Sequence, residues 1–301
     1  MNAIIEIGTN SLKMLIYKTE PDFKTVFDKT IITRLGESYK QTGEISCLAL
    51  KRNINEIIKC QELIKTYDCV EVLLYGTMIF RSAKNSQDVL KEIHEKTGLN
   101  LEIISGQEEA EYSFLAASHS FQIKDKKVLV IDTGGGSTEF IFGQSNQIED
   151  AESLDIGAVT LTDSFSLDKQ VDTGNLEKCE AYIKEKFQGL SGKIKPDLVI
   201  GIGGTVTTIS AIAQELDPYS ADKVHGSVIS LERITELAVE LSLKNFEERK
   251  DIIGLSSKRA DIILAGVLIV KTIMQKYRRS KMLVCDHGLR YGLALKEWRK
   301  K

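Results

Sequence analysis

The stretch IIEIGTNS at residues 4–11 returns later in the chain as VIDTGGGS at residues 130–137. Each copy has an apolar run rich in β-branched residues, an acid, a glycine-containing loop that ends in serine, and a second strand-like run. This order predicts a hairpin whose loop N–H groups can approach phosphate oxygens, while the acid at the strand end holds a divalent cation or its water. Two copies predict two similar domains that face one phosphate.

The composition bounds the class of protein. A chain of 301 residues with 42% hydrophobic and 28% charged residues is long enough for two domains with proper cores. The net charge of −3 argues against a protein that coats nucleic acid. No stretch approaches the ~20 apolar residues of a membrane span, and the first residues do not resemble a signal peptide. We therefore expect a cytoplasmic protein without nucleic-acid or membrane partners.

The five cysteines are scattered and the four histidines form no pair at metal-ligand spacing. Neither a disulfide framework nor a zinc site is indicated, so a catalytic site is expected to use carboxylates.

Strand-like and helix-like runs alternate along the chain, which is typical of an α/β layer architecture. Helices are expected over Leu48–Tyr67, Thr77–Lys96 and Arg259–Tyr277, among others. A polar segment near Ile123 separates two halves of the same plan. The expected domains are residues 1–122 and residues 123–301.

Two glycine-rich segments are candidates for phosphate binding. Gly134, Gly135 and Gly136 remove every side chain from the loop after a buried strand, so the backbone can approach an anion. The alternative is a tight hairpin that needs positive φ. Gly203 and Gly204 follow another strand and open a helix, whose dipole favours phosphate, although an ordinary turn would look the same.

The segment that begins at Ser105 predicts a helix start. Ser105 and Glu108 have capping-box spacing, which gives Glu108 a structural role. Glu109 has no such role and is a candidate to accept a proton from an attacking water. The alternative is a solvated acid that favours the helix N-terminus.

Arg81 lies in a predicted helix just after a strand, where a guanidinium could clamp a phosphate with two hydrogen bonds. A surface arginine is the alternative. Arg259 and Asp261 begin an apolar helix and are expected to form a structural pair or cap.

Together these segments resemble the exopolyphosphatase / guanosine pentaphosphate phosphohydrolase (Ppx/GppA) family of the actin-like ATPase superfamily. The resemblance covers almost the whole chain and rests on ordered motifs: EIGTNS at 6–11, TMIFRSAKN at 77–85, ISGQEEAEY at 104–112, DTGGGSTEF at 132–140, GIGGTVTT at 201–208, RADIILAG at 259–266 and DHGLRYGLA at 286–294.

The resemblance implies an α/β fold of two ribonuclease-H-like domains around a cleft. The implied reaction removes the terminal phosphate of inorganic polyphosphate or the 5′ γ-phosphate of pppGpp, with Glu109 as base. The implied cofactor is Mg²⁺, or Mn²⁺, held by Asp132, Glu139 and Glu6. The expected phosphate-binding residues are Asn10, Ser11, Arg81, Gly134, Gly135, Gly136, Ser137, Gly203, Gly204 and Thr205.

Three positions depart from the family pattern. Glu6 stands where aspartate is usual, and its extra methylene moves the carboxylate by about 1.5 Å. Gln107 replaces an acid, and Tyr291 occupies a position that is often glutamate. The family's final helix tends to cross back to the first domain, as residues 289–301 would here. Longer relatives add helical domains, so a preference for short polyphosphate or a nucleotide is expected.

Two other functions fit the same motifs. An ATP-dependent kinase or ATPase of the superfamily would also use paired loops and the glycine turn. A non-catalytic sensor would bind guanosine penta- or tetraphosphate without turnover. Apolar helices in the second half indicate a homodimer.

Overall fold

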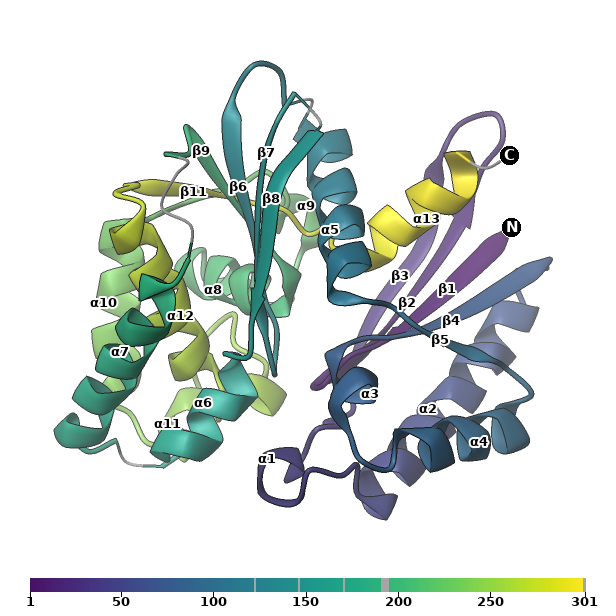
Figure 1. The fold of residues 1–301 in the computed structure, drawn as a ribbon, viewed down its shortest axis with the longest axis horizontal. Coiled ribbons are helices and arrows are strands. Elements are labelled where there is room, and N and C mark those ends of the chain that lie inside the picture. The colour runs from purple at the N-terminus through teal and green to yellow at the C-terminus, as the bar shows by residue number, and fades with distance from the viewer. Residues whose placement is uncertain (122, 146, 170, 191–194, 300–301) are drawn as a thin grey trace. The chain divides into compact units, whose positions relative to one another are not determined.

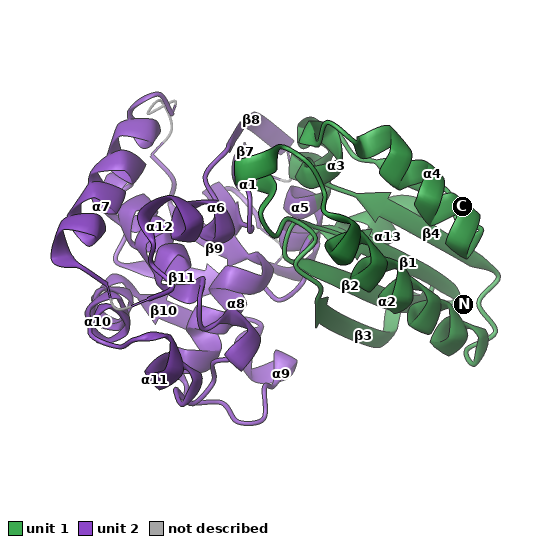
Figure 2. Cartoon of the chain, turned by 90° about the horizontal axis from the view of Figure 1, so that it is seen from below, with its two compact units in different colours: residues 1–112, 289–301 green, residues 113–288 purple. Residues whose placement is uncertain are grey.

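The computed structural model describes residues 1–121, 123–145, 147–169, 171–190 and 195–299. The chain divides into two compact units: unit 1 comprises Met1–Tyr112 and Leu289–Lys301, and unit 2 comprises Ser113–Gly288 (Figure 2). The division falls inside helix α5 (Gly106–Phe121), before the boundary expected near Ile123. Residue 122, which ended the expected first domain, and residues 300–301 lie outside the described residues. No described helix is both long and apolar enough to span a membrane.

Unit 1 is built on a five-stranded sheet in the order β3-β2-β1-β4-β5 (Figure 1). The first three strands pair antiparallel, and β4 and β5 continue the sheet in parallel with β1. This is the strand order of a ribonuclease-H-like domain, as expected. The strands are β1 (Asn2–Ile7), β2 (Ser11–Lys18), β3 (Lys24–Ile32), β4 (Glu71–Gly76) and β5 (Leu101–Ile103).

The helices of unit 1 are α1 (Tyr39–Thr42), α2 (Cys47–Lys65), α3 (Met78–Ser82), α4 (Ser86–Thr97), the first part of α5, and α13 (Leu289–Arg299). Alternate side chains of β1, such as Ile5 and Ile7, belong to one apolar core with residues of α2 and α4. Helix α13 packs against β1 and β2. The final helix therefore groups with the sheet formed by the start of the chain.

The helix expected over Thr77–Lys96 is in fact two helices, α3 and α4. The interruption lies around Asn85, whose amide exchanges hydrogen bonds with the backbone of Ile45: the Ile45 N–H donates to Oδ1 at 3.0 Å, and Nδ2 donates to the Ile45 carbonyl at 2.9 Å. The Ser86 hydroxyl also donates to the Phe80 carbonyl at 2.6 Å. These bonds compete with helix continuation.

Unit 2 repeats the same sheet plan with one added edge strand, in the order β10-β11-β9-β6-β7-β8. Strands β6, β7 and β8 pair antiparallel, and β9 and β11 extend the sheet in parallel with β6. The strands are β6 (Lys127–Thr133), β7 (Thr138–Gln144), β8 (Gln147–Leu154), β9 (Leu198–Ile202), β10 (Val228–Ser230) and β11 (Lys281–Val284). The sequence repeat is thus a repeat of sheet topology.

Helices cover the larger apolar core of unit 2. They are α6 (Ala158–Phe165), α7 (Thr173–Gln188), α8 (Gly203–Ala213), α9 (Ala221–Val224), α10 (Leu231–Ser242), α11 (Phe246–Lys250), the 3₁₀ turn η1 (Ser257–Arg259) and α12 (Ile263–Lys276). Helix α12 begins later than the expected helix over Arg259–Tyr277, because Arg259 ends the preceding 3₁₀ turn.

Candidate active site

The two repeated phrases form hairpin turns with the same hydrogen bond. In unit 1 the Gly8 N–H donates to the Ser11 carbonyl at 2.9 Å, and in unit 2 the Gly134 N–H donates to the Ser137 carbonyl at 2.9 Å. Each turn joins the carboxyl end of the first strand of its sheet to the second strand. The hairpins expected from sequence are confirmed in both units.

In unit 1 the carbonyls of the hairpin loop are bound by the segment that follows β3. The Thr9 carbonyl accepts the Gly36 N–H at 2.8 Å, and the Asn10 carbonyl accepts the N–H groups of Thr33 and Arg34 at 3.0 Å. The N–H groups of Thr9 and Asn10 donate to none of the described residues. The carbonyls of this loop are therefore already hydrogen-bonded, whereas its N–H groups can still donate to a ligand.

The loop of unit 2 has the same polarity and a different support. The Gly134 carbonyl accepts the Ala158 N–H at 2.9 Å and the Gly135 carbonyl accepts the Val159 N–H at 2.8 Å, both from the start of α6. Within the part of the chain that the structure describes, the N–H groups of Gly135 and Gly136 have no acceptor. Successive unpaired N–H groups of this kind bind anions.

The hairpin does not itself require glycine at Gly134. Its φ is not positive, and an added Cβ would meet only the Ser137 carbonyl oxygen, at an ordinary 3.4 Å. Gly157 is different, because a Cβ there would lie 2.3 Å from the backbone of Gly135. Gly157 is thus needed to seat the loop on α6, whereas at Gly134 the bare backbone favours ligand approach over the tight-turn alternative.

Two acids face each other across the unit 2 hairpin. Asp132 on β6 and Glu139 on β7 are direct cross-strand partners, so their side chains share one face of the sheet. They are only 9% and 2% exposed. The Ser153 hydroxyl donates to Glu139 at 2.9 Å. Two opposed, buried carboxylates are unfavourable without a compensating positive charge.

The same position in unit 1 holds an ion pair. Glu6 on β1 is the cross-strand partner of Lys13 on β2, and the Lys13 ammonium lies 2.7 Å from Glu6 Oε1. Glu6 is 3% exposed, and its Oε2 accepts no hydrogen bond from the described residues. Because Lys13 already neutralises Glu6, this acid is a weak candidate for binding a metal.

The donor set of unit 2 suits Mg²⁺, which prefers carboxylate oxygens and usually binds one or two carboxylates together with waters and substrate phosphates. Among the described residues no three side chains of His, Cys, Asp or Glu gather into a metal site. Asp132 and Glu139 would thus hold the ion as a pair, with the remaining ligands supplied by water and substrate.

The glycine turn after β9 lies against Asp132. Gly203 has a φ of 79°, and a Cβ there would lie 2.1 Å from Asp132 Oδ1. Only glycine therefore allows the carboxylate to approach the start of α8, whose first N–H groups have no side-chain cap. Thr205 has a packing role, because its Cγ2 would lie 2.4 Å from a Cβ on Gly266 of α12.

Arg259 was missed as a member of this region. Its guanidinium lies over Gly204, 2.4 Å from where a Cβ would stand. Desolvation lowers the pKa of Arg259 from its ordinary value. Gly204 leaves space for this guanidinium. The glycine turn was therefore the feature of the sequence that could have indicated a side chain packed over it.

In unit 1, Arg81 and Glu109 lie together. Arg81 Nη1 donates to the Glu109 carboxylate at 2.9 Å and to the Ile104 carbonyl at 2.6 Å. Glu109 is 7% exposed, which is lower than the solvated alternative implies. Nε and Nη2 of Arg81 donate to none of the described residues. The two candidates from separate motifs therefore form one group.

The capping box at the start of α5 is confirmed. The Ser105 N–H donates to Glu108 at 2.9 Å, and the Glu108 N–H donates to the Ser105 hydroxyl at 3.2 Å. The bond from the Ser105 backbone is the main reason that the pKa of Glu108 is lowered. Glu108 is thus structural, which leaves Glu109 as the acid of this turn for chemistry.

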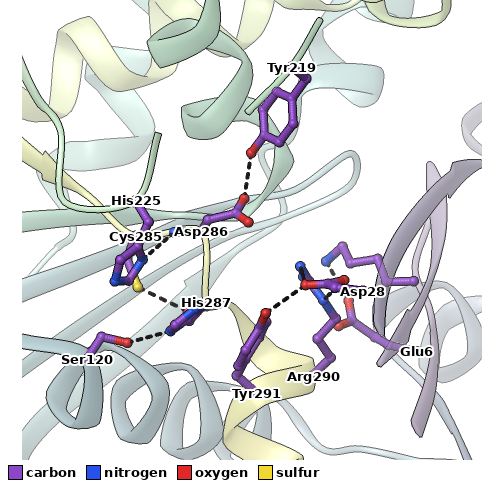
Figure 3. Close-up of polar contacts among 11 residues, drawn as sticks. Glu6, Asp28, Ser120, Tyr219, His225, Cys285, Asp286, His287, Arg290 and Tyr291 are labelled. Atoms are coloured by element: carbon purple, nitrogen blue, oxygen red, sulfur yellow. Dashed lines mark hydrogen bonds and ion pairs between the residues drawn. The ribbon is translucent and has the colours of Figure 1, made fainter. Parts of the chain in front are cut away.

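Tyr291, a departure from the family pattern, anchors α13 in unit 1 (Figure 3). Its hydroxyl donates to Asp28 of β3 at 2.8 Å, and Arg290 donates to both oxygens of Asp28 at 2.9 and 2.6 Å. Burial raises the pKa of Tyr291, so the hydroxyl keeps its proton. The tyrosine therefore has a structural role.

The structure also gathers two histidines of unit 2 that are distant in sequence. The rings of His225 and His287 stack with centroids 4.2 Å apart, and Ser120 Oγ lies 2.9 Å from His287 Nδ1 (Figure 3). Tyr219 donates to Asp286 at 2.7 Å beside them. Burial lowers the pKa of His225. No short spacing in the sequence could reveal this cluster.

The sequence pattern of the Ppx/GppA phosphatase family matches residues 15–301. A bifunctional 3-dehydroquinate synthase/phosphatase of Fusobacterium nucleatum is 30% identical over 309 residues, which cover 98% of this chain and 46% of that protein. Exopolyphosphatase 2 of Mycobacterium tuberculosis is 26% identical over 310 residues, which cover 97% of both chains.

Solved structures agree with this match. The Aquifex aeolicus member of the Ppx/GppA family superposes with a TM-score of 0.83 at 29% identity, covering 99% of this chain and 97% of that one. An exopolyphosphatase from Cytophaga hutchinsonii has a TM-score of 0.92 at 24% identity, with 99% and 97% covered, a likeness of fold. The chain belongs to the Ppx/GppA phosphatase family.

Proposed function

We propose that the protein is a phosphohydrolase that releases the terminal phosphate of inorganic polyphosphate, with the 5′ γ-phosphate of pppGpp as the second substrate. One observation carries the proposal: a buried pair of carboxylates, Asp132 and Glu139, stands beside a loop in which the N–H groups of Gly135 and Gly136 have no acceptor among the described residues. Such a site suits a phosphate with its cation. The exopolyphosphatases among the relatives support polyphosphate as the substrate.

Each candidate residue has a distinct role in this reaction. Glu109 accepts a proton from a water molecule while the oxygen of that water bonds to the terminal phosphorus. The bond from the terminal phosphorus to the bridging oxygen breaks. Arg81 orients the Glu109 carboxylate through Nη1 and offers Nε and Nη2 to phosphate oxygens. The N–H groups of Gly135 and Gly136 bind the phosphoryl oxygens that gain charge.

Asp132 and Glu139 would hold Mg²⁺, or Mn²⁺, in this proposal. When bound, the ion would neutralise charge on the phosphate oxygens, and water would complete its coordination. Glu6, already paired with Lys13, is left out of this role. The two hairpins are therefore proposed to act unequally.

The test compares purified wild-type protein with Glu109→Gln on polyphosphate, pppGpp and ATP, each with Mg²⁺. Glutamine keeps the size of the side chain and a carbonyl that can accept the Arg81 bond, while it cannot take the proton. Phosphate release is expected to fall by about 10²–10⁴-fold. Glu111→Gln, at an exposed position of the same helix, is the matched control and should retain activity.

The outcomes separate the candidate functions. Undiminished release by Glu109→Gln would remove Glu109 as the base. A clear preference for ATP would favour a kinase or ATPase, and tight binding of pppGpp without turnover by the wild type would favour a sensor.

A further inference from the structure

The first turn of α5 carries Glu109, and a general base must be held within about 0.5 Å of its productive position. The capping box between Ser105 and Glu108 begins the helix, and Arg81 holds the Glu109 carboxylate. Both contacts act on the first turn of α5. A second element of unit 1 contacts the turn that follows.

Helix α13 makes a backbone contact with α5 one turn after Glu109. A Cβ on Gly292 would lie 1.8 Å from the carbonyl oxygen of Tyr112, so no other residue fits at this crossing. Tyr112 lies three positions after Glu109, which places it on the adjacent turn of the same helix. The contact therefore bears directly on the turn that carries the proposed base.

A polar chain extends this contact. Lys296, one turn after Gly292 on α13, donates a hydrogen bond to the Tyr112 hydroxyl. An ammonium can only donate, so the Tyr112 oxygen accepts this bond. Hydrogen bonds from the Ser105 backbone and side chain are the main causes that lower the pKa of Glu108, and the Lys296 charge and the Tyr112 hydroxyl act more weakly in the same direction. Although desolvation opposes it, the bond to Tyr112 leaves the pKa of Lys296 raised, so the lysine stays charged.

Helix α13 is itself fixed to the sheet at both ends. Arg290 and Tyr291 bond Asp28 at its start (Figure 3). Near its end, the indole N–H of Trp298 donates to the Thr19 carbonyl at 3.1 Å. These anchors do not involve α5, so α13 can serve as a fixed reference for it.

We propose that Lys296 and Tyr112 are positioning residues for Glu109: α13 holds the first turns of α5 through the hydrogen bond from Lys296 to Tyr112 and the close approach of Gly292 to the Tyr112 carbonyl. This inference rests on the proposed role of Glu109 as the base. Neither positioning residue is expected to touch the substrate.

The test uses Lys296→Met, Lys296→Arg and Tyr112→Phe in the full chain. Lys296→Met removes the donor, and Tyr112→Phe removes only the hydroxyl. Each should lower kcat for phosphate release by about 10- to 100-fold, because a small misplacement of a catalytic group is costly, while KM changes less than about twofold. Lys296→Arg should keep most of the activity. Lys91→Met, exposed on α4, is the control.

Two further measurements separate positioning from general stability. In a Glu109→Gln background, Lys296→Met should cause no further loss of kcat, since residues that act as a unit are not additive. Hydrogen exchange should rise at residues 106–112 and stay unchanged in α2. Should Lys296→Met fail to fold, Tyr112→Phe decides.

The inference is overturned if Lys296→Met and Tyr112→Phe keep wild-type kcat while Glu109→Gln is inactive. It is also overturned if exchange at residues 106–112 does not change. If Glu109→Gln retains activity, the proposed function of Glu109 fails first and the inference fails with it.

Discussion

The hairpins of the two units share their backbone and differ in charge. Both turns are closed by the same 2.9 Å bond between a glycine N–H and a serine carbonyl, and both keep loop N–H groups that donate to none of the described residues. Opposite the first acid, however, unit 1 has Lys13 and unit 2 has Glu139. A single cross-strand position therefore separates a neutral hairpin from one with two acids.

This difference indicates how a duplicated element takes on two roles. In unit 1 the positive charge is part of the chain, because Lys13 lies 2.7 Å from Glu6. In unit 2 the cross-strand partner of Asp132 is a second acid, Glu139, so a cation bound to the pair would stabilise the fold. The proposed function therefore assigns a cation to unit 2 and none to unit 1.

The largest expected effect comes from removing the acid of each hairpin in turn. Asp132→Asn should lower phosphate release by on the order of 10²–10³-fold, because charge stabilisation in the transition state is lost. Glu6→Gln should lower it less than about tenfold, since Glu6 is already neutralised. Initial rates at saturating Mg²⁺ measure both.

Thermal unfolding supplies a second comparison for the same variants. Mg²⁺ at 100 times its Kd should stabilise wild type and Glu6→Gln by about 2.7 kcal/mol. Asp132→Asn should lose this gain. Equal losses of rate in the two variants would break the proposed inequality of the hairpins.

The next largest effect is a change in the free energy of unfolding. It is expected when the residue that differs between the hairpins, Lys13 in unit 1 and Glu139 in unit 2, is replaced by its counterpart. Lys13→Glu leaves two buried acids opposed in unit 1 and should cost about 3–5 kcal/mol, because it breaks a nearly buried ion pair. Glu139→Lys gives unit 2 the internal ion pair of unit 1. It should remove stabilisation by Mg²⁺ without destabilising the protein. Chemical unfolding with and without Mg²⁺ measures both.

Lys91→Glu on the exposed face of α4 controls for the change in net charge. A Lys13→Glu variant as stable as this control would show that the ion pair of unit 1 has no structural role.

A smaller effect is expected at the loop glycines. Gly134→Ala should change stability by less than about 1 kcal/mol, because its Cβ meets only ordinary contacts, yet it should lower activity about tenfold by obstructing the phosphate. Gly8→Ala, with equally ordinary contacts, should have a weaker effect on activity. Melting temperature and initial rate separate the two properties.

Gly157→Ala is the opposite case, since its Cβ would lie 2.3 Å from the Gly135 backbone. It should destabilise the protein by about 1–3 kcal/mol. If Gly134→Ala behaved like Gly157→Ala, the glycine triplet would be a structural turn.

Much of the fold follows from local patterns in the sequence. The repeated phrase predicted both hairpins, and the spacing of Ser105 and Glu108 predicted the capping box. These features depend on residues close together in the chain. The helix expected over Thr77–Lys96 was wrong because Asn85 bonds Ile45, forty positions away.

The candidate site was predicted residue by residue, and its pairings were not. Lys13 could have been found, because it follows Glu6 at the same interval as Glu139 follows Asp132. The contact of Arg259 with Gly204 and the bond of Tyr291 to Asp28 could not have been found from the sequence. Sheet order brings the first pair together, and the return of α13 brings the second pair together. Charge partners across a fold depend on topology.

The smallest expected effect is the pH dependence of stability that Glu108 of α5 contributes. This acid belongs to neither hairpin, so the hairpin variants share the contribution. The pKa of Glu108 is lowered in the folded protein, chiefly by the Ser105 N–H. Its stabilisation is therefore present above the unfolded glutamate pKa of about 4.3 and is lost as pH falls through the lower folded pKa. Glu108→Gln keeps an acceptor for the Ser105 N–H and removes the charge at the helix N-terminus, so it should cost about 0.5 kcal/mol at pH 7. Unfolding curves of wild type and Glu108→Gln should converge below about pH 4, and a difference that persists there would assign the effect to packing.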